Sequence, residues 1–265
     1  MINPAEQSSQ ADIPLDGKTR RLGCDRAVVL DVLRLSKRVP SFPVERWFDL
    51  REIAHARKAA ETRVSWLTLF GKAYCLACQD IPELRRTYIS FPWPSFYQSS
   101  YCVLSVAVNR EVNSRDRLFF GRLHRLEDKP LQTIQAELDA LANDDVSRVF
   151  RQQVIGSKFP SLIRRLGWWW RTVRPSQRAR RIGTCSMSVL ASDGVLNRQH
   201  PNMLTSSLSY GPMQGDGRMW VTLQCDHRLL DGRTAARAIN LLEKHLHGSV
   251  LEELMAMQTN AIKAA

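Results

Sequence analysis

One short stretch, DHRLLDG at residues 226–232, places a histidine and two carboxylates around a single turn. His227 and Asp231 are four residues apart, and Gly232 follows directly. Imidazole titrates near neutral pH, so His227 is suited to transferring a proton in a reaction. A structural interpretation is equally open at this point. Asp231 beside a glycine could cap a helix, and His227 could be an ordinary loop histidine.

The residues on either side of this stretch predict a strand before the turn and a helix after it. Apolar residues alternate along 219–225, which is typical of a half-buried strand. From Ala235 to Leu246 they recur at helical spacing, and Gly248 follows as a stop. The turn that carries His227 is therefore held by a regular element at each end.

The remaining elements follow from the same patterns. A short helix is expected from Arg26, and the chain becomes extended at Val39–Pro40, because a residue before proline avoids the α region. Helices are expected at 50–62, 64–81 and 126–141, the second of them buried and stopped by Pro82. Strands are expected at 42–46, 101–108 and 183–195, with a turn at Asp193–Gly194.

Composition favours one folded domain after a polar tail. The chain has 265 residues, of which 44% are hydrophobic and 24% charged, and its net charge is +12. Residues 1–24 are polar and predict a disordered tail, which leaves 25–260 for the domain. The sequence contains no apolar run of about 18 residues and no secretory signal at its start, so we expect neither a membrane span nor export.

Six cysteines in a chain of this size do not indicate a disulfide scaffold. Cys75 and Cys78 form a CxxC motif, but it lies in a helical apolar pattern and no second CxxC accompanies it. We therefore expect reduced cysteines, no metal site and a cytoplasmic protein.

Segment 154–182 carries eight lysines or arginines and no acid, with Trp168, Trp169 and Trp170 in its middle. Three interpretations remain open. The segment could be a buried helix end with solvated arginines. It could be an interfacial helix on anionic lipid at the inner membrane surface. It could also be a binding surface for coenzyme A phosphates or for an acidic carrier protein. Nucleic acid is not expected, because no recognisable binding motif accompanies the basic residues.

The stretch around His227 resembles the His-x-x-x-Asp-Gly motif of chloramphenicol acetyltransferases and of the catalytic domain of dihydrolipoyl acyltransferases. The Asp-His-Arg opening is the dihydrolipoyl version. GTCSMS at 183–188 resembles the strand of that family that holds its catalytic serine, with Ser188 at the serine position and Ser186 at the preceding threonine. The order of elements supports the resemblance from about Arg26 to about Met255. Two further family segments have counterparts here, Ser36-Lys37-Arg38-Val39-Pro40 and Ile81-Pro82-Glu83-Leu84. Residues 203–213 resemble the family strand that precedes the final hairpin.

Three departures limit what the resemblance transfers. Val32 replaces an arginine of the family and Ser41 a histidine, and segment 109–125 lacks the usual Gly-Leu-x-x-Pro-Val-Ile. Contacts to the substrate from these places are therefore left unassigned. Ser188 also stands only 39 positions before His227, a shorter spacing than is usual in the family.

The resemblance implies a fold and a site. The fold is an α/β two-layer sandwich around a mixed β-sheet, chloramphenicol acetyltransferase-like and trimeric, with the active site between subunits. His227 would be the general base and Ser188 the donor to the oxyanion. Asp231 would be structural and pair with an arginine, for which Arg34 and Arg38 are candidates, while Gly232 would let the turn close.

The function implied is a stand-alone acyltransferase without a lipoyl domain. It would move an acyl group from a coenzyme A or acyl carrier protein thioester to a hydroxyl, amine or thiol of a small or lipid-like acceptor. No bound cofactor is expected, and the coenzyme A thioester is a co-substrate. Two alternatives remain, namely a non-catalytic trimeric scaffold relative and a core subunit of a 2-oxo acid dehydrogenase-type complex.

Overall fold

The computed structural model describes residues 18–19, 22–112 and 114–264 of the chain. Most of the predicted tail at 1–24 lies outside the described residues. The helices are α1 (Ala27–Ser36), α2 (Arg51–Ala59), α3 (Trp66–Asp80), α4 (Leu131–Asn143), α5 (Val146–Val149), α6 (Arg151–Lys158), α7 (Ser161–Val173), α8 (Pro175–Ile182), α9 (Gly232–His245) and α10 (Leu251–Ala264). The strands are β1 (Ser41–Asp49), β2 (Arg86–Ile89), β3 (Ser95–Gln98), β4 (Val103–Glu111), β5 (Asp116–His124), β6 (Cys185–Met187), β7 (Ser206–Tyr210) and β8 (Arg218–Asp226).

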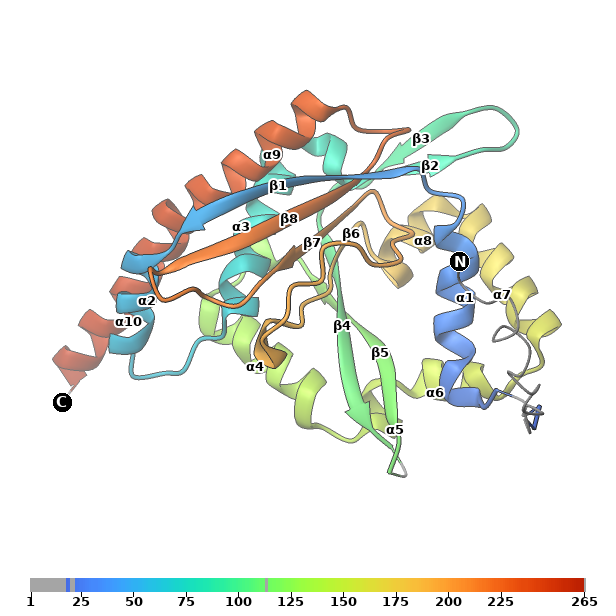
Figure 1. Cartoon of the computed structure of the whole chain (residues 1–265), viewed down its shortest axis with the longest axis horizontal. Coiled ribbons are helices and arrows are strands. Elements are labelled where there is room, and N and C mark those ends of the chain that lie inside the picture. Colours follow the sequence, from blue (N-terminus) through green and yellow to red (C-terminus); the bar gives the residue numbers. More distant parts are fainter. Residues whose placement is uncertain (1–17, 20–21, 113, 265) are drawn as a thin grey trace, which may run out of the picture.

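Six of these strands form one mixed sheet in the order β1-β8-β7-β6-β4-β5 (Figure 1). The short β6 runs parallel to both β4 and β7, and the other neighbours are antiparallel. The hairpin β2–β3 stands apart from this sheet. Helices α3 and α9 contact each other behind β1 and β8, so the predicted two-layer α/β sandwich is confirmed.

The two faces of the sheet differ in chemistry, because successive side chains of a strand point to opposite sides. Leu223 and Cys225 of β8, with Cys185 and Met187 of β6, belong to the hydrophobic core shared with α3 and α9. The opposite face is polar yet buried. It presents the side chains of Ser105, Ser207, Ser209, Thr222 and Gln224. A polar face inside the molecule has to satisfy its hydrogen bonds, and it is there that the site residues gather.

The elements around the DHRLLDG turn are those that the sequence predicts, namely β8 before it and α9 after it. The buried helix α3 is also confirmed. Ser65 caps it by accepting a hydrogen bond from the Thr68 backbone, and it ends at Asp80, before Pro82. Strand β5 and the β2–β3 hairpin were not predicted.

The strand expected at 183–195 is mostly absent from the sheet. Only Cys185–Met187 pairs as a strand, and Ser188 adds one further bond, from its backbone nitrogen to the oxygen of Leu208. The chain then leaves the sheet, and Gly194 turns it with a φ of 76°. Alternation of residues could not reveal this exit, because Val189 and Ala191 still pack against the hydrophobic core, while Ala191–Asp193 form a helical turn instead of pairing with a strand.

The basic segment 154–182 folds into α6, α7 and α8 beside α1, at the end of the sheet formed by β4 and β5 (Figure 1). Trp168 is partly buried, and its indole nitrogen donates to Asp31 at 3.1 Å. Trp169 and Trp170 remain 56% and 51% exposed. The buried-helix interpretation is therefore wrong for these two tryptophans. No helix among the described residues is long and apolar enough to cross a bilayer.

Candidate active site

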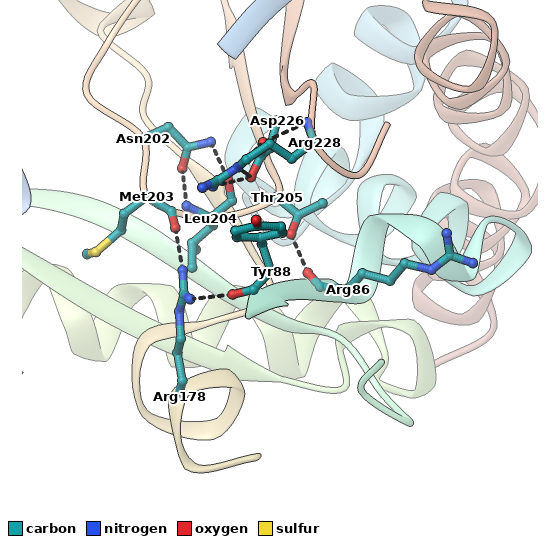
Figure 2. A network of polar contacts seen from close by, with 9 residues as sticks. All are labelled: Arg86, Tyr88, Arg178, Asn202, Met203, Leu204, Thr205, Asp226 and Arg228. Carbon is teal, nitrogen blue, oxygen red and sulfur yellow. Dashed lines mark hydrogen bonds and ion pairs between the residues drawn. The ribbon is translucent and has the colours of Figure 1, made fainter. Parts of the chain in front are cut away.

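The residues on both sides of His227 are locked in place. Arg228 donates to both carboxylate oxygens of Asp226, with Nε–Oδ1 at 2.9 Å and Nη2–Oδ2 at 2.6 Å. Its guanidinium also lies over the ring of Tyr88, 4.2 Å from the centroid (Figure 2). A bidentate ion pair that also stacks on an aromatic ring fixes geometry more tightly than a single contact. The first residues of the turn that carries His227 are therefore held rigidly.

The same network ties the turn to two elements outside the sheet (Figure 2). Arg178 of α8 donates to the carbonyl oxygens of Tyr88 at 3.3 Å and Met203 at 2.9 Å. Burial, and then repulsion from Arg228, lowers the pKa of Arg178 to about 10. The β2–β3 hairpin thus has a positioning role, since Tyr88 receives contacts from both arginines.

His227 itself has one nitrogen satisfied by the backbone. Its Nδ1 lies 3.2 Å from the carbonyl oxygen of Leu230, and its backbone nitrogen donates to Pro40 at 2.9 Å. A carbonyl oxygen can only accept, so this contact assigns the proton to Nδ1 and leaves the Nε2 lone pair free to act as a base. The residue is exposed, and its ring packs against Phe42 at 4.7 Å between centroids.

Asp231 caps the helix that follows. Its Oδ1 accepts a hydrogen bond from the Thr234 backbone at 2.7 Å, and hydrogen bonds from Thr234 lower the pKa of this carboxyl. Among the described residues, neither Arg34 nor Arg38 forms an ion pair with it. A Cβ added at Gly232 would meet nothing within 4 Å, so the turn does not require a glycine for steric reasons. The observed role of Asp231 is that of a helix cap.

The two candidate serines differ in what their hydroxyls contact. Ser186 donates to Ser207 at 2.8 Å and to Asn202 at 3.3 Å. Ser188 is half-buried just past the end of β6, and its hydroxyl has no hydrogen-bond partner among the described residues. A hydroxyl without a partner can donate to a substrate without first breaking a bond inside the protein. The geometry therefore favours Ser188 over Ser186 as an oxyanion donor.

His200 joins this group, although the sequence offers no periodic pattern that singles it out. Its Nε2 lies 2.6 Å from the Ser207 hydroxyl, and its Nδ1 is buried without a partner in the described part of the chain. Burial lowers the pKa of His200 to about 4, so its ring is neutral at neutral pH. Together with Asn202 and Gln224, it lines a cavity of about 360 Å³ next to the loop that holds the backbone of His227.

Within one chain, Ser188 and His227 do not meet. Met187 is level with Leu208, and Leu208 is level with Leu223, four residues before His227. Ser188 lies one residue further in the opposite direction. Five residues of a strand span roughly 16 Å, and two strand spacings add roughly 10 Å sideways. The predicted base and the predicted oxyanion donor could therefore work together only across an interface between chains.

A larger cavity, of about 430 Å³, lies on the polar side of the sheet beneath α7. Its wall is mainly apolar, and Arg122, Arg164 and Arg181 also contribute to it. This volume is in the range of pockets that hold small molecules. Six of its apolar residues are Val28, Phe120, Ile155, Ile163, Trp168 and Ile182. Its volume exceeds that of the cavity beside His200, and none of its lining residues belongs to the His227 turn.

Two further cysteines lie beside the CxxC motif of α3 in the folded chain. The sulfurs of Cys102 and Cys185 lie 3.3 Å apart, and both are hydrogen-bonding neighbours of Cys75 and Cys78. Burial raises the pKa of the Cys75 and Cys78 thiols. Burial acts in the same direction on Cys185, but hydrogen bonds from the other three thiols outweigh it and lower the pKa of Cys185. All six cysteines are free.

No protein-family model and no curated protein matches the sequence, whereas solved structures match the fold. A dihydrolipoamide acetyltransferase of Azotobacter vinelandii aligns over 92% of this chain and 98% of its own, with 18% identity and a TM-score of 0.63. A probable dihydrolipoamide acetyltransferase of Listeria monocytogenes aligns over 88% and 95%, with 14% identity and a TM-score of 0.63. A chloramphenicol acetyltransferase aligns over 86% and 100%, with 13% identity and a TM-score of 0.50. The resemblance predicted from the motif is thus confirmed at the level of architecture, and the chain has the fold shared by dihydrolipoamide acetyltransferases and chloramphenicol acetyltransferase.

Proposed function

We propose that this protein is an acyltransferase in which His227 is the general base. The observation that carries the proposal is the hydrogen bond between His227 Nδ1 and the carbonyl oxygen of Leu230. It selects the tautomer that a base needs and holds the ring on an exposed turn. The Azotobacter vinelandii enzyme supports the assignment, because its catalytic mechanism has been investigated at a serine, a histidine and an asparagine, the last two being four residues apart. His227 and Asp231 have that same separation.

The proposed reaction needs no covalent enzyme intermediate. The Nε2 of His227 takes the proton of the acceptor hydroxyl, amine or thiol as that group attacks the thioester carbonyl. The new bond gives a tetrahedral oxyanion, to which the hydroxyl of Ser188 donates a hydrogen bond. The carbon–sulfur bond then breaks, and the departing thiolate receives the proton from the imidazolium. Acceptor and donor have exchanged the acyl group and one proton.

The complete site requires a second copy of the chain. The separation of His227 and Ser188 within one chain is too large for both to contact one thioester carbonyl. We therefore assign His227 of one subunit and Ser188 of its neighbour to each site, in a homotrimer. In this arrangement Asp231 acts through the turn, by capping α9 and holding the direction of the loop that carries His227.

We assign the larger cavity, which is lined mainly by apolar side chains and lies apart from the His227 turn of the same chain, to a lipid-like acceptor or acyl chain. The outer side of α7 points to the same class of molecule. Leu162, Leu166, Trp169 and Val173 recur at helical spacing and are all more than half exposed. Arg165 and Arg174 are exposed beside them. An apolar stripe flanked by cations suits an anionic lipid surface, so we assign α7 to peripheral membrane contact.

The direct test is release of free thiol from acyl-coenzyme A, measured over a panel of chain lengths with and without an amphiphilic alcohol or amine. We expect acceptor-dependent release that is larger for long chains than for acetyl. Acyl carrier protein thioesters form a second panel for the other donor. Release with neither donor would contradict the proposal and leave the non-catalytic scaffold. Activity restricted to dihydrolipoamide as acceptor would instead support the core subunit of a 2-oxo acid dehydrogenase-type complex.

A further inference from the structure

Four buried thiols meet inside the core from three separate elements. Cys75 and Cys78 lie one turn apart on α3, so both face the same side of the helix. Cys102 precedes β4, and Cys185 begins β6. All four residues have 0% exposure. The tertiary fold brings these thiols together, since Cys185 is more than 80 residues from Cys102 in the chain and their sulfurs are 3.3 Å apart.

The spacing of these sulfurs suits one small ion. The sulfurs of Cys78, Cys102 and Cys185 all lie within 4.8 Å of one another. In a tetrahedral zinc–thiolate centre with bonds of about 2.3 Å, the sulfurs are roughly 3.8 Å apart. The contact between Cys102 and Cys185, at 3.3 Å, is somewhat shorter than that value, and the sulfur of Cys78 lies within 4.8 Å of both. Small rotations of the side chains would therefore bring the three thiols, and Cys75 beside them, to ligand distance.

Two polar groups lie around the thiols, and each is also tied to the backbone. Glu127 Oε1 accepts from the Cys102 nitrogen at 3.1 Å, and the Thr184 hydroxyl accepts from the Val103 nitrogen at 3.0 Å. One carboxylate oxygen of Glu127 lies within 4.8 Å of the sulfurs of Cys75 and Cys102, and its Oε2 is buried without a partner among the described residues. The Thr184 hydroxyl is 3.7 Å from the sulfur of Cys102 and 3.9 Å from that of Cys185. Metal ligands are commonly held by such an outer shell of hydrogen-bonding groups.

We propose that Cys75, Cys78, Cys102 and Cys185 form a structural zinc site, with Glu127 and Thr184 as its outer shell. A set of four thiolates selects zinc or iron, and zinc needs no redox partner. Each thiol that binds releases its proton to solvent, and the ion takes the place of the hydrogen bonds among the sulfurs. The closed coordination leaves no position for substrate, so the ion has no part in the acyl transfer.

Zinc at this site would affect β6, the strand that leads to Ser188. Cys185 is the first residue of β6, whose continuation carries Ser186 and Ser188, and β6 has only three residues paired in the sheet. An ion bound to Cys185, to Cys102 beside β4 and to α3 would anchor this short strand at its start. The zinc site would thereby fix the position of the proposed oxyanion donor without touching the substrate.

The test is the metal content of the whole protein purified without chelator from cells grown with added zinc. We expect about one zinc ion per chain, released when a mercurial reagent blocks the thiols. Replacement by cobalt should give intense sulfur-to-cobalt absorption in the near ultraviolet. Cys78→Ala and Cys185→Ala should lose the ion. Cys225→Ala is the matched control, because it removes an equally buried cysteine of β8 that lies outside the thiol cluster.

The metal content and the thiols of the wild-type protein test the proposal without relying on a variant that might fail to fold. Wild-type protein with less than about a tenth of an equivalent of zinc or iron, and all six thiols reactive in denaturant, would overturn the proposal. A Cys102–Cys185 disulfide in the mass of the non-reduced protein would overturn it as well. Retention of zinc by folded Cys185→Ala would place the ion elsewhere. None of these results depends on whether the protein transfers acyl groups.

Discussion

The Nδ1 of His227 and the carbonyl oxygen of Leu230, 3.2 Å apart, set the chemistry of the exposed turn after β8. The contact spans only three residues, so the turn itself orients the ring before any substrate arrives. The bidentate ion pair between Arg228 and Asp226 holds the first half of the turn, and the helix cap formed by Asp231 holds the second half. Local contacts therefore set the direction of the ring, and Pro40, Phe42 and Tyr88 hold the turn from outside.

Replacing His227 by alanine should lower thiol release on the order of 100-fold or more, because general bases contribute this much. The fold should be unchanged, since the side chain is exposed. His55→Ala is the matched control, an exposed histidine on α2. Steady-state rates and circular dichroism check both variants. A His227→Ala enzyme that keeps more than about a tenth of the rate would rule out the general-base role.

Ser188→Ala should lower kcat on the order of 100-fold with little change in the KM for the donor, because the oxyanion exists only in the transition state. Ser186→Ala should mainly lower the melting temperature, because it breaks bonds to Ser207 and Asn202. Full kinetic curves for both variants separate these effects. A loss confined to KM in Ser188→Ala, with the loss of kcat appearing in Ser186→Ala, would reverse the two assignments.

A site shared between subunits predicts that two inactive variants restore each other. Co-expressed His227→Ala and Ser188→Ala chains should form mixed trimers in which about one interface in four combines an intact histidine with an intact serine. Activity should return to a corresponding fraction of wild type. Light scattering should give about three times the mass of one chain. Absence of any recovery in confirmed mixed trimers would contradict the shared site.

Two substitutions distinguish a helix-capping role of Asp231 from a role in a pair of opposite charges. Asp231→Asn keeps a good N-cap and should keep most of the stability and activity, whereas Asp231→Ala should lower both. Hydrogen bonds from Thr234 lower the pKa of Asp231 in the folded state. Its stabilising effect is thus complete above the ordinary carboxyl range and is lost as pH falls through the folded pKa. Melting temperatures from neutral to acid pH test this. An inactive but stable Asp231→Asn would indicate an essential charge.

The stripe on α7 should bind anionic vesicles weakly and reversibly. Each cation near such a surface contributes about 1 kcal/mol and is screened by salt, so co-sedimentation should fall steeply as ionic strength rises. Replacing Trp169 and Trp170 by serine should abolish binding and leave the fold intact. Trp168→Ser is the contrasting variant, since it removes the contact with Asp31 and should lower the melting temperature. No binding at low salt would contradict membrane contact and would leave coenzyme A phosphates or a second copy of the chain as the partner of α7.

The sequence by itself determined the strand–turn–helix around His227 and the helix α3, whereas the class of fold came from the resemblance of the motifs to a known family. These depend on periodicity and turn chemistry within about thirty residues, which local physics dictates. The cap by Asp231 was one of two interpretations available from the same residues. The choice between them required the position of its oxygen relative to the Thr234 nitrogen.

Only the tertiary structure decided which distant residues share a space. The order of the strands brings Cys102 to Cys185 and keeps Ser188 away from His227, and nothing in the spacing along the chain encodes either result. The same holds for His200, which lies in a loop without periodicity and becomes part of the polar face by packing on Ser207. Distances between sequence-remote side chains follow from strand order and register, which are set by the packing of the whole core.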